Sequence, residues 1–251
     1  MYLASIDILS ANANQVIAFI EKHVPGIVLN HRTDTGAIPR HPSALADALY
    51  FLDTLEHFIP TLPQDVVYRH LPIIRTYIQL PSNPALRPHL ESAHSVFLAI
   101  LARGDMLQDQ IPIYLNEVYT AFPSILSPRQ VTLAFSTVIK LSSPVKANEI
   151  MTELLRHAST ARAEPLQGGV DEQLTYLFAA VDSLRWLEVD VIEFWLEQIV
   201  FVARGLTGRR RENIVERLWE CVSGEMGGDV GLTAVEWWVN GGKGKVMGAK
   251  L

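Results

Sequence analysis

Apolar residues recur along most of this chain every three or four positions, which is the spacing of one face of an α-helix. The clearest stripes are formed by Leu174, Leu177, Phe178 and Val181, and by Val191, Trp195, Ile199 and Val202. Runs that alternate apolar and polar residues are rare, and no Asn-Gly or Asp-Gly turn joins two strand-like segments. The pattern therefore predicts an all-α fold.

Several helix starts are marked by a small polar residue before an apolar stripe, usually with proline next. The starts lie at Ser43, Asn83-Pro84, Ser127-Pro128 and Ser143-Pro144. The polar side chain accepts a hydrogen bond from a first-turn amide, and proline has no amide hydrogen to leave unsatisfied. With segments near 4–22, 64–79 and 106–122, we expect about ten helices joined by short turns.

Short connections place consecutive helices antiparallel to one another. Successive pairs of roughly 40 residues predict an irregular α-solenoid of antiparallel helix pairs, like HEAT or armadillo repeats. No clean repeat motif is present, so an irregular helical bundle is the alternative. We expect one helical domain over 1–239, with a possible sub-boundary near 162–169. Residues 240–251 then form a flexible tail, because 240–248 are rich in glycine and lysine.

The segment from His23 to Pro42 interrupts the helical pattern. A structureless stretch of about 20 residues is uncommon in a compact domain unless it is functional or disordered. Its apolar residues, such as Ile27 and Leu29, need burial, so we expect an ordered loop packed on the helices. It is either a partner-binding loop or a plain connection.

The last three residues, Ala249, Lys250 and Leu251, are a small residue, a base and leucine. This is a conservative variant of the Ser-Lys-Leu address that directs proteins to peroxisomes. A receptor can bind the terminal carboxylate, bury Leu251 in an apolar pocket, offer an acidic group to Lys250 and admit only a small residue at 249. The tripeptide predicts peroxisomal localisation through a tetratricopeptide import receptor.

Composition narrows the possibilities further. The chain has 251 residues, a net charge of -6 and a single cysteine, Cys221. The charge does not favour nucleic acid, and one cysteine cannot form an internal disulfide. No apolar run approaches the roughly 18 residues that a membrane span needs, and no basic region resembling a secretory signal precedes Ile6.

The eight histidines form no strong catalytic or metal-binding motif. His89 and His94 are five positions apart, whereas the zinc-protease motif needs four. His31, His41 and Asp34 share the long loop and could converge only by folding. The chain has no nucleophile elbow and no phosphate-binding glycine loop, so we expect neither a catalytic residue nor a cofactor. Cys221 lies on an apolar stripe and is expected to be a buried thiol.

Two features of the C-terminal third could contact a partner. Arg209, Arg210 and Arg211 form a basic patch at a helix start, which is either solvated or a contact for an acidic partner or lipid headgroup. Trp237 and Trp238 are adjacent and cannot both face inward on one helix. One of them is therefore a candidate exposed anchor.

The chain also resembles the C-terminal part of the fungal peroxin-8 family. The likeness lies in the terminal tripeptide, in Pro25–His31 (Pro-Gly-Ile-Val-Leu-Asn-His) and in the stretch Ile38–Asp53. Members of that family are typically longer, and most have serine where this chain has Ala249. The resemblance implies a lumenal protein, peripherally associated with the peroxisomal membrane, that engages cargo receptors and links the docking and RING assemblies of matrix-protein import.

These observations favour a non-enzymatic scaffold of the peroxisomal import machinery. The alternative is an all-α peroxisomal matrix enzyme whose site is assembled from distant residues such as His31, Asp34 and His41. A third possibility is a cytosolic helical scaffold whose ending is coincidental.

Overall fold

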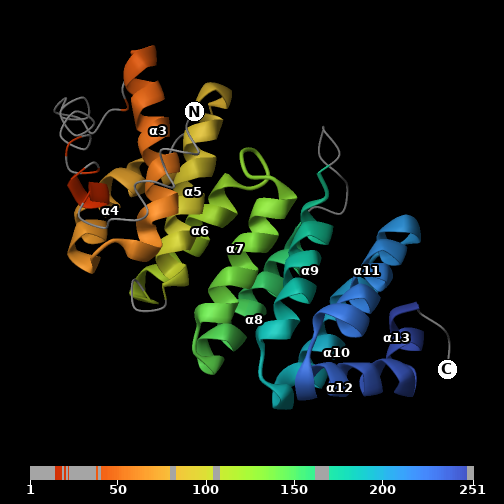
Figure 1. Ribbon diagram of the computed structural model, residues 1–251. Helices are drawn as coiled ribbons and strands as arrows, with labels where there is room; N and C mark the ends of the chain where they lie inside the picture. The colour runs from red at the N-terminus through yellow and green to blue at the C-terminus, as the bar shows by residue number, and fades with distance from the viewer. Residues whose placement is uncertain are drawn as a thin grey trace. The chain divides into compact units, whose positions relative to one another are not determined.

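The computed structural model describes residues 15–18, 20, 22, 38, 41–79, 83–103, 108–161 and 170–247 (Figure 1). Regular structure in these residues is helical throughout and contains no strand; residues 15–18, 20 and 22 are helical, and helices α3–α13 follow them. The fold is an all-α solenoid, as predicted. It divides into two compact units, Met1–Glu117 and Val118–Leu251.

The first unit is built around helix α5, which packs against both α3 and α4. Its helices are α3 (Pro42–Phe58), α4 (Gln64–Ile78), α5 (Arg87–Ala102) and the start of α6 (Ile111–Ala121). Short 3-10 turns precede or follow them at Ile59–Thr61, Pro84–Leu86 and Gln108–Gln110. Buried leucine, isoleucine and phenylalanine side chains from these helices form the core, including Leu52, Leu55, Ile74, Leu90 and Ile100.

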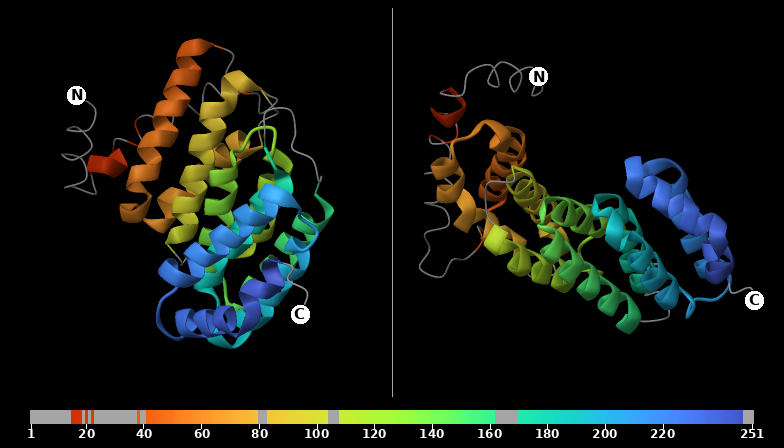
Figure 2. Two further views of the ribbon diagram at one scale, coloured as in Figure 1. Left: turned by 90° about the vertical axis from the view of Figure 1, so that its right-hand side faces the viewer. Right: turned by 90° about the horizontal axis from the view of Figure 1, so that it is seen from below.

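The second unit begins with three helices that lie side by side, α7 (Pro128–Leu141), α8 (Pro144–Thr160) and α9 (Glu172–Ser183) (Figure 2). Four more follow: α10 (Ile192–Ala203), α11 (Gly208–Glu220), α12 (Gly228–Trp237) and α13 (Lys243–Met247). Two π-helical segments, Cys221–Glu225 and Trp238–Gly242, extend α11 and α12. Helix α9 packs against α7, α8 and α11.

The predicted helix starts are largely confirmed. Ser127 forms a full capping box with Gln130, and the Ser143 hydroxyl accepts a hydrogen bond from the Lys146 amide at 3.4 Å. Asn83 opens a short 3-10 turn ahead of α5, where its side chain accepts from the Ala85 amide. The start predicted at Ser43 is displaced, because Pro42 occupies the first turn and His41 is the capping residue.

Part of the segment predicted as a flexible tail, 240–251, is helical in the structure. Residues 243–247 form α13, and the chain reaches this helix through a kink at Asn240 and Gly241, whose backbone angles are not helical. The glycines at 241 and 242 are required by the backbone angle and by close packing, and not by chain flexibility. Gly241 has φ +119°, and a Cβ on Gly242 would lie 2.6 Å from the Trp237 ring. Residues 248–251 and the sub-boundary predicted at 162–169 lie outside the described residues.

Candidate functional site

The predicted receptor-binding residues Ala249, Lys250 and Leu251 lie outside the described residues. The structure does describe the helix that leads to them. Met247, the last residue of α13, lines a groove between α13 and α11. This groove is the candidate site that the described part of the chain offers.

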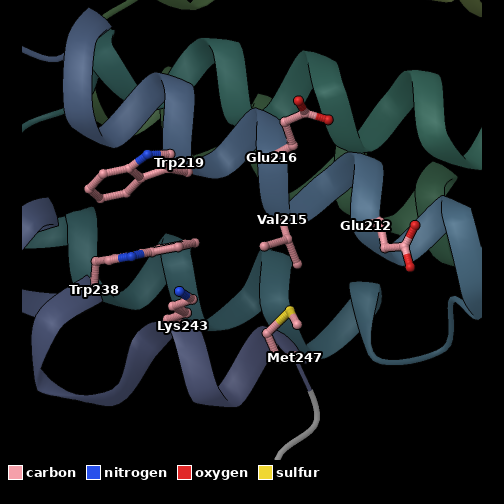
Figure 3. A pocket seen from close by; sticks show the side chains of 7 residues that line it. All are labelled: Glu212, Val215, Glu216, Trp219, Trp238, Lys243 and Met247. Carbon is pink, nitrogen blue, oxygen red and sulfur yellow. The ribbon is translucent and has the colours of Figure 1, made fainter.

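The groove has a volume of about 580 Å³, within the range of ligand-binding clefts. It is lined by Glu212, Val215, Glu216, Trp219, Trp238, Lys243 and Met247 (Figure 3). At one end the rings of Trp219 and Trp238 face each other, with centroids 5.4 Å apart and planes inclined by 32°. The groove therefore has an apolar, largely aromatic interior with charged groups at its rim.

Helix α11 supplies one wall because it is anchored to α9 by its opposite side. Arg210 makes a bidentate ion pair with Asp171, at 2.5 and 2.8 Å, and Arg217 donates to Asp182 at 2.6 Å. Asp171 also caps α9 by accepting from the Leu174 amide. The groove-lining residues of α11 recur at spacings of three and four, so they share the other face.

Helix α13 supplies the other wall and is held against α10. The carboxylate of Glu197 on α10 accepts hydrogen bonds from Lys245 Nζ at 2.5 Å and from the Trp237 indole at 2.7 Å. Partial burial acts to raise the pKa of Glu197, but these two hydrogen bonds outweigh it and leave the pKa below its ordinary value. Val246 of α13 is buried. The short helix is thus fixed by packing and by a charged contact.

The expectation that Trp237 or Trp238 is exposed is wrong, since only 7% and 8% of their surfaces are accessible. The backbone leaves helical geometry at Asn240 and Gly241, and the chain that follows this kink covers the Trp237 ring through Gly242. Trp237 packs on Gly242 and Trp238 on Trp219. Of the two groove-lining indoles, Trp219 is the accessible one, at 45%. Trp219 lies beside two glutamates on the outer face of α11, and this position in the sequence could have identified it as an exposed tryptophan.

Replacing Gly242 by alanine is expected to disrupt the α13 wall of the groove. The added methyl would meet three atoms of the Trp237 ring at 2.6 to 2.8 Å, and overpacking of this kind costs about 1–3 kcal/mol. Gly244→Ala is the matched control, because nothing lies within 4 Å of its Cβ position. Urea unfolding followed by tryptophan emission compares the two. Equal stability of the two variants would contradict the assigned role of Gly242.

The other sequence candidates for chemistry have structural roles where they are described. The His94 ring bonds the Tyr114 hydroxyl, and His89 bonds the Leu45 carbonyl. Cys221 is buried, as predicted, and its thiol donates to the Val181 carbonyl at 3.4 Å. Burial raises the pKa of this thiol to about 12, which keeps it protonated. His41 caps α3.

No group of three or more metal-ligating side chains forms within the described residues. His23, His31 and Asp34 lie outside them. None of the described helices is long and apolar enough to cross a bilayer.

The basic patch at the start of α11 is partly used within the fold. Arg210 pairs with Asp171 and Gln173. Arg211 donates to the backbone carbonyls of Leu206 and Arg204. Two of the three guanidinium groups of the patch therefore stabilise the start of α11 through contacts within the chain.

Comparison with known proteins finds two similarities, both to peroxisome proteins. Residues 16–102 match the PEX8 central TPR-like domain. The chain is also 23% identical over 204 residues to a protein named peroxisomal membrane protein PEX17 from Yarrowia lipolytica, covering 66% of this chain and 30% of that relative. No solved structure matches.

Both similarities are to peroxins, which confirms the predicted link to the peroxisome and to its biogenesis. The resemblance to peroxin-8 is supported only in part. The matched domain is the central one, so the expected correspondence with the C-terminal portion is not supported.

Proposed function

We propose that this chain is a non-enzymatic helical scaffold of the machinery that imports matrix proteins into peroxisomes. The observation that carries the proposal is the similarity to two peroxins over a chain that folds as an α-solenoid. Stacked helices present extended surfaces suited to holding other proteins. On this proposal the chain engages the import receptor and links the docking and RING assemblies on the lumenal side, as a peripheral protein of the membrane.

The receptor contact in this proposal is the tripeptide Ala249-Lys250-Leu251. A tetratricopeptide receptor would bind the Leu251 carboxylate through fixed donors and bury its side chain, while Lys250 meets an acidic group. The enzyme alternative offers His31, Asp34 and His41 as examples of distant residues that folding would bring together. His41 caps a helix start, and the other two are not among the described residues.

Deleting Leu251 is expected to abolish receptor binding. The deletion moves the free carboxylate by one residue and removes the apolar anchor, so affinity for the purified receptor should fall at least about 100-fold. Fluorescence anisotropy of the purified chain measures this. Imaging of an N-terminally tagged chain should change from punctate to diffuse. Gly248→Ala is the control, since it leaves the tripeptide intact.

The alternatives give different results in the same experiment. Punctate fluorescence that survives removal of the tripeptide would reject it as the signal. Diffuse fluorescence of the intact chain would favour the cytosolic scaffold. Reconstitution with purified docking and RING complexes tests the linking role, and failure to bring the two together on one chain would refute it.

A further inference from the structure

We propose that the groove between α11 and α13 binds a short amphipathic helix of a partner protein, one that carries apolar anchors with lysine or arginine along one flank. The inference rests on the proposed scaffold function and names the kind of segment that the scaffold would hold. It is supported by three features of the groove: its apolar interior, its length and the placement of its charges.

The interior of the groove presents accessible apolar surface. Trp219 is 45% exposed and Met247 is 51% exposed, and both line the cavity together with Val215 (Figure 3). Tryptophan supplies much of the binding energy in protein interfaces, and methionine adapts its shape to a bound apolar side chain. Trp238 supports the Trp219 ring from within the fold, so the anchor surface is in place before binding.

The length of the groove suits a helix of about two turns. Its α11 wall runs from Glu212 to Trp219, seven positions apart, which corresponds to roughly 10 Å along the helix axis. A bound amphipathic helix places apolar anchors at i, i+4 and i+7 over that same distance. Such a helix can lie along α11 with its apolar side against the two tryptophans.

The charged residues at the rim of the groove determine which charge the flanking residues of the partner helix should carry. Glu212 and Glu216 lie one turn apart on the α11 wall, and neither makes an ion pair with another described residue. Two basic residues, lysine or arginine, one turn apart on the partner helix would each meet one of these carboxylates. Lys243 stands on the opposite wall, so the partner's other flank should be neutral or acidic. This asymmetry fixes the orientation of the bound helix.

The same acidic rim argues for a protein rather than a membrane as the occupant. Anionic bilayers attract polybasic surfaces, whereas two exposed glutamates beside the apolar opening would be repelled. An apolar groove with acidic groups on one wall is complementary to a basic amphipathic helix. We therefore commit to a peptide segment and treat lipid as an outcome of the test.

The probe is a fluorescein-labelled peptide of about 15 residues in which leucines form one helical face, with lysines along one flank of that face and serines along the other. Its binding to the purified full chain is followed by anisotropy at physiological salt. We expect micromolar affinity, weakened about tenfold or more by Glu212→Lys/Glu216→Lys and by Trp219→Ala. The charge-reversed pair should gain affinity for the matching leucine–glutamate peptide.

A matched control separates the groove from the net charge of the chain. Glu193→Lys/Glu236→Lys makes the same change in charge at exposed positions outside the groove lining and should leave binding unchanged. A lysine–serine peptide without apolar anchors should bind at least about tenfold more weakly than the leucine–lysine peptide. Circular dichroism verifies that each variant is folded.

Several results would overturn the proposal. Equal loss in the control pair, or equal binding of the lysine–serine peptide, would show attraction by net charge alone. Unchanged affinity of Trp219→Ala would remove the apolar anchor. Binding to phosphatidylserine vesicles that depends on Trp219, without peptide binding, would assign the groove to lipid. Because this assay does not depend on localisation, its failure is distinct from failure of the import proposal.

Discussion

Replacing Arg217 by methionine is expected to lower the free energy of unfolding of the second unit by about 2–3 kcal/mol. Arg217 donates to Asp182 at 2.6 Å, to Glu225 at 2.7 Å and to Glu220 at 3.1 Å. The Asp182 side chain is only 13% exposed. Burial raises the pKa of Asp182, and Arg217 opposes that shift. Without the guanidinium, α9 retains a buried carboxylate that has lost its main partner.

The measurement uses the fact that all five tryptophans lie in the second unit. Their emission during urea unfolding therefore reports on the unit that contains Arg217. Lys146→Met is the control, because its ion pair with Glu149 is exposed and of the kind that contributes under about 1 kcal/mol. Equal destabilisation by the two substitutions would contradict the role assigned to Arg217.

A second substitution separates the loss of a contact from the cost of an unpaired charge. Asp182→Asn removes the carboxylate that the Arg217→Met substitution leaves without its main partner. The double variant should be more stable than the sum of the single effects by about 1 kcal/mol or more. Additive effects would show that Arg217 and Asp182 do not stabilise α11 through each other. Because α11 forms one wall of the groove, the destabilised variant should also bind the leucine–lysine peptide more weakly.

Local sequence signals predicted the helices well because each acts within one turn. A serine before proline satisfies an amide three residues away, and an apolar stripe needs only its own helix to be recognised. Both work at Ser127 and Ser143. The buried state of Cys221 followed from the same stripe.

The groove depends on contacts between residues far apart in the sequence, which no local pattern reveals. Arg210 meets Asp171 over 39 positions, and Lys245 meets Glu197 over 48. The Asn240-Gly241-Gly242 stretch was predicted to be a flexible tail, but glycine is compatible with close packing as well as with disorder. What decides between them is the Trp237 ring that lies against Gly242.

Acidification is expected to destabilise the first unit through His94. This histidine lies on α5, with its Nδ1 3.3 Å from the Tyr114 hydroxyl and Nε2 buried without a hydrogen-bond partner among the described residues. Burial lowers the pKa of His94 from 6.5 to about 4. Between these two values the unfolded chain binds a proton that the folded chain does not. Stability is therefore fully present above pH 6.5 and falls as the pH approaches 4.

The expected loss from this one group is about 2 kcal/mol between pH 7 and pH 5. His94→Leu removes the titrating ring, so its stability should depend less on pH by that amount, although the variant also loses the Tyr114 hydrogen bond at every pH. Hydrogen exchange of α5 amides, read by mass spectrometry at both pH values, measures opening of this unit. Tryptophan emission gives the parallel result for the second unit. If wild type and His94→Leu lose equal protection on acidification, His94 is not the group that titrates on unfolding.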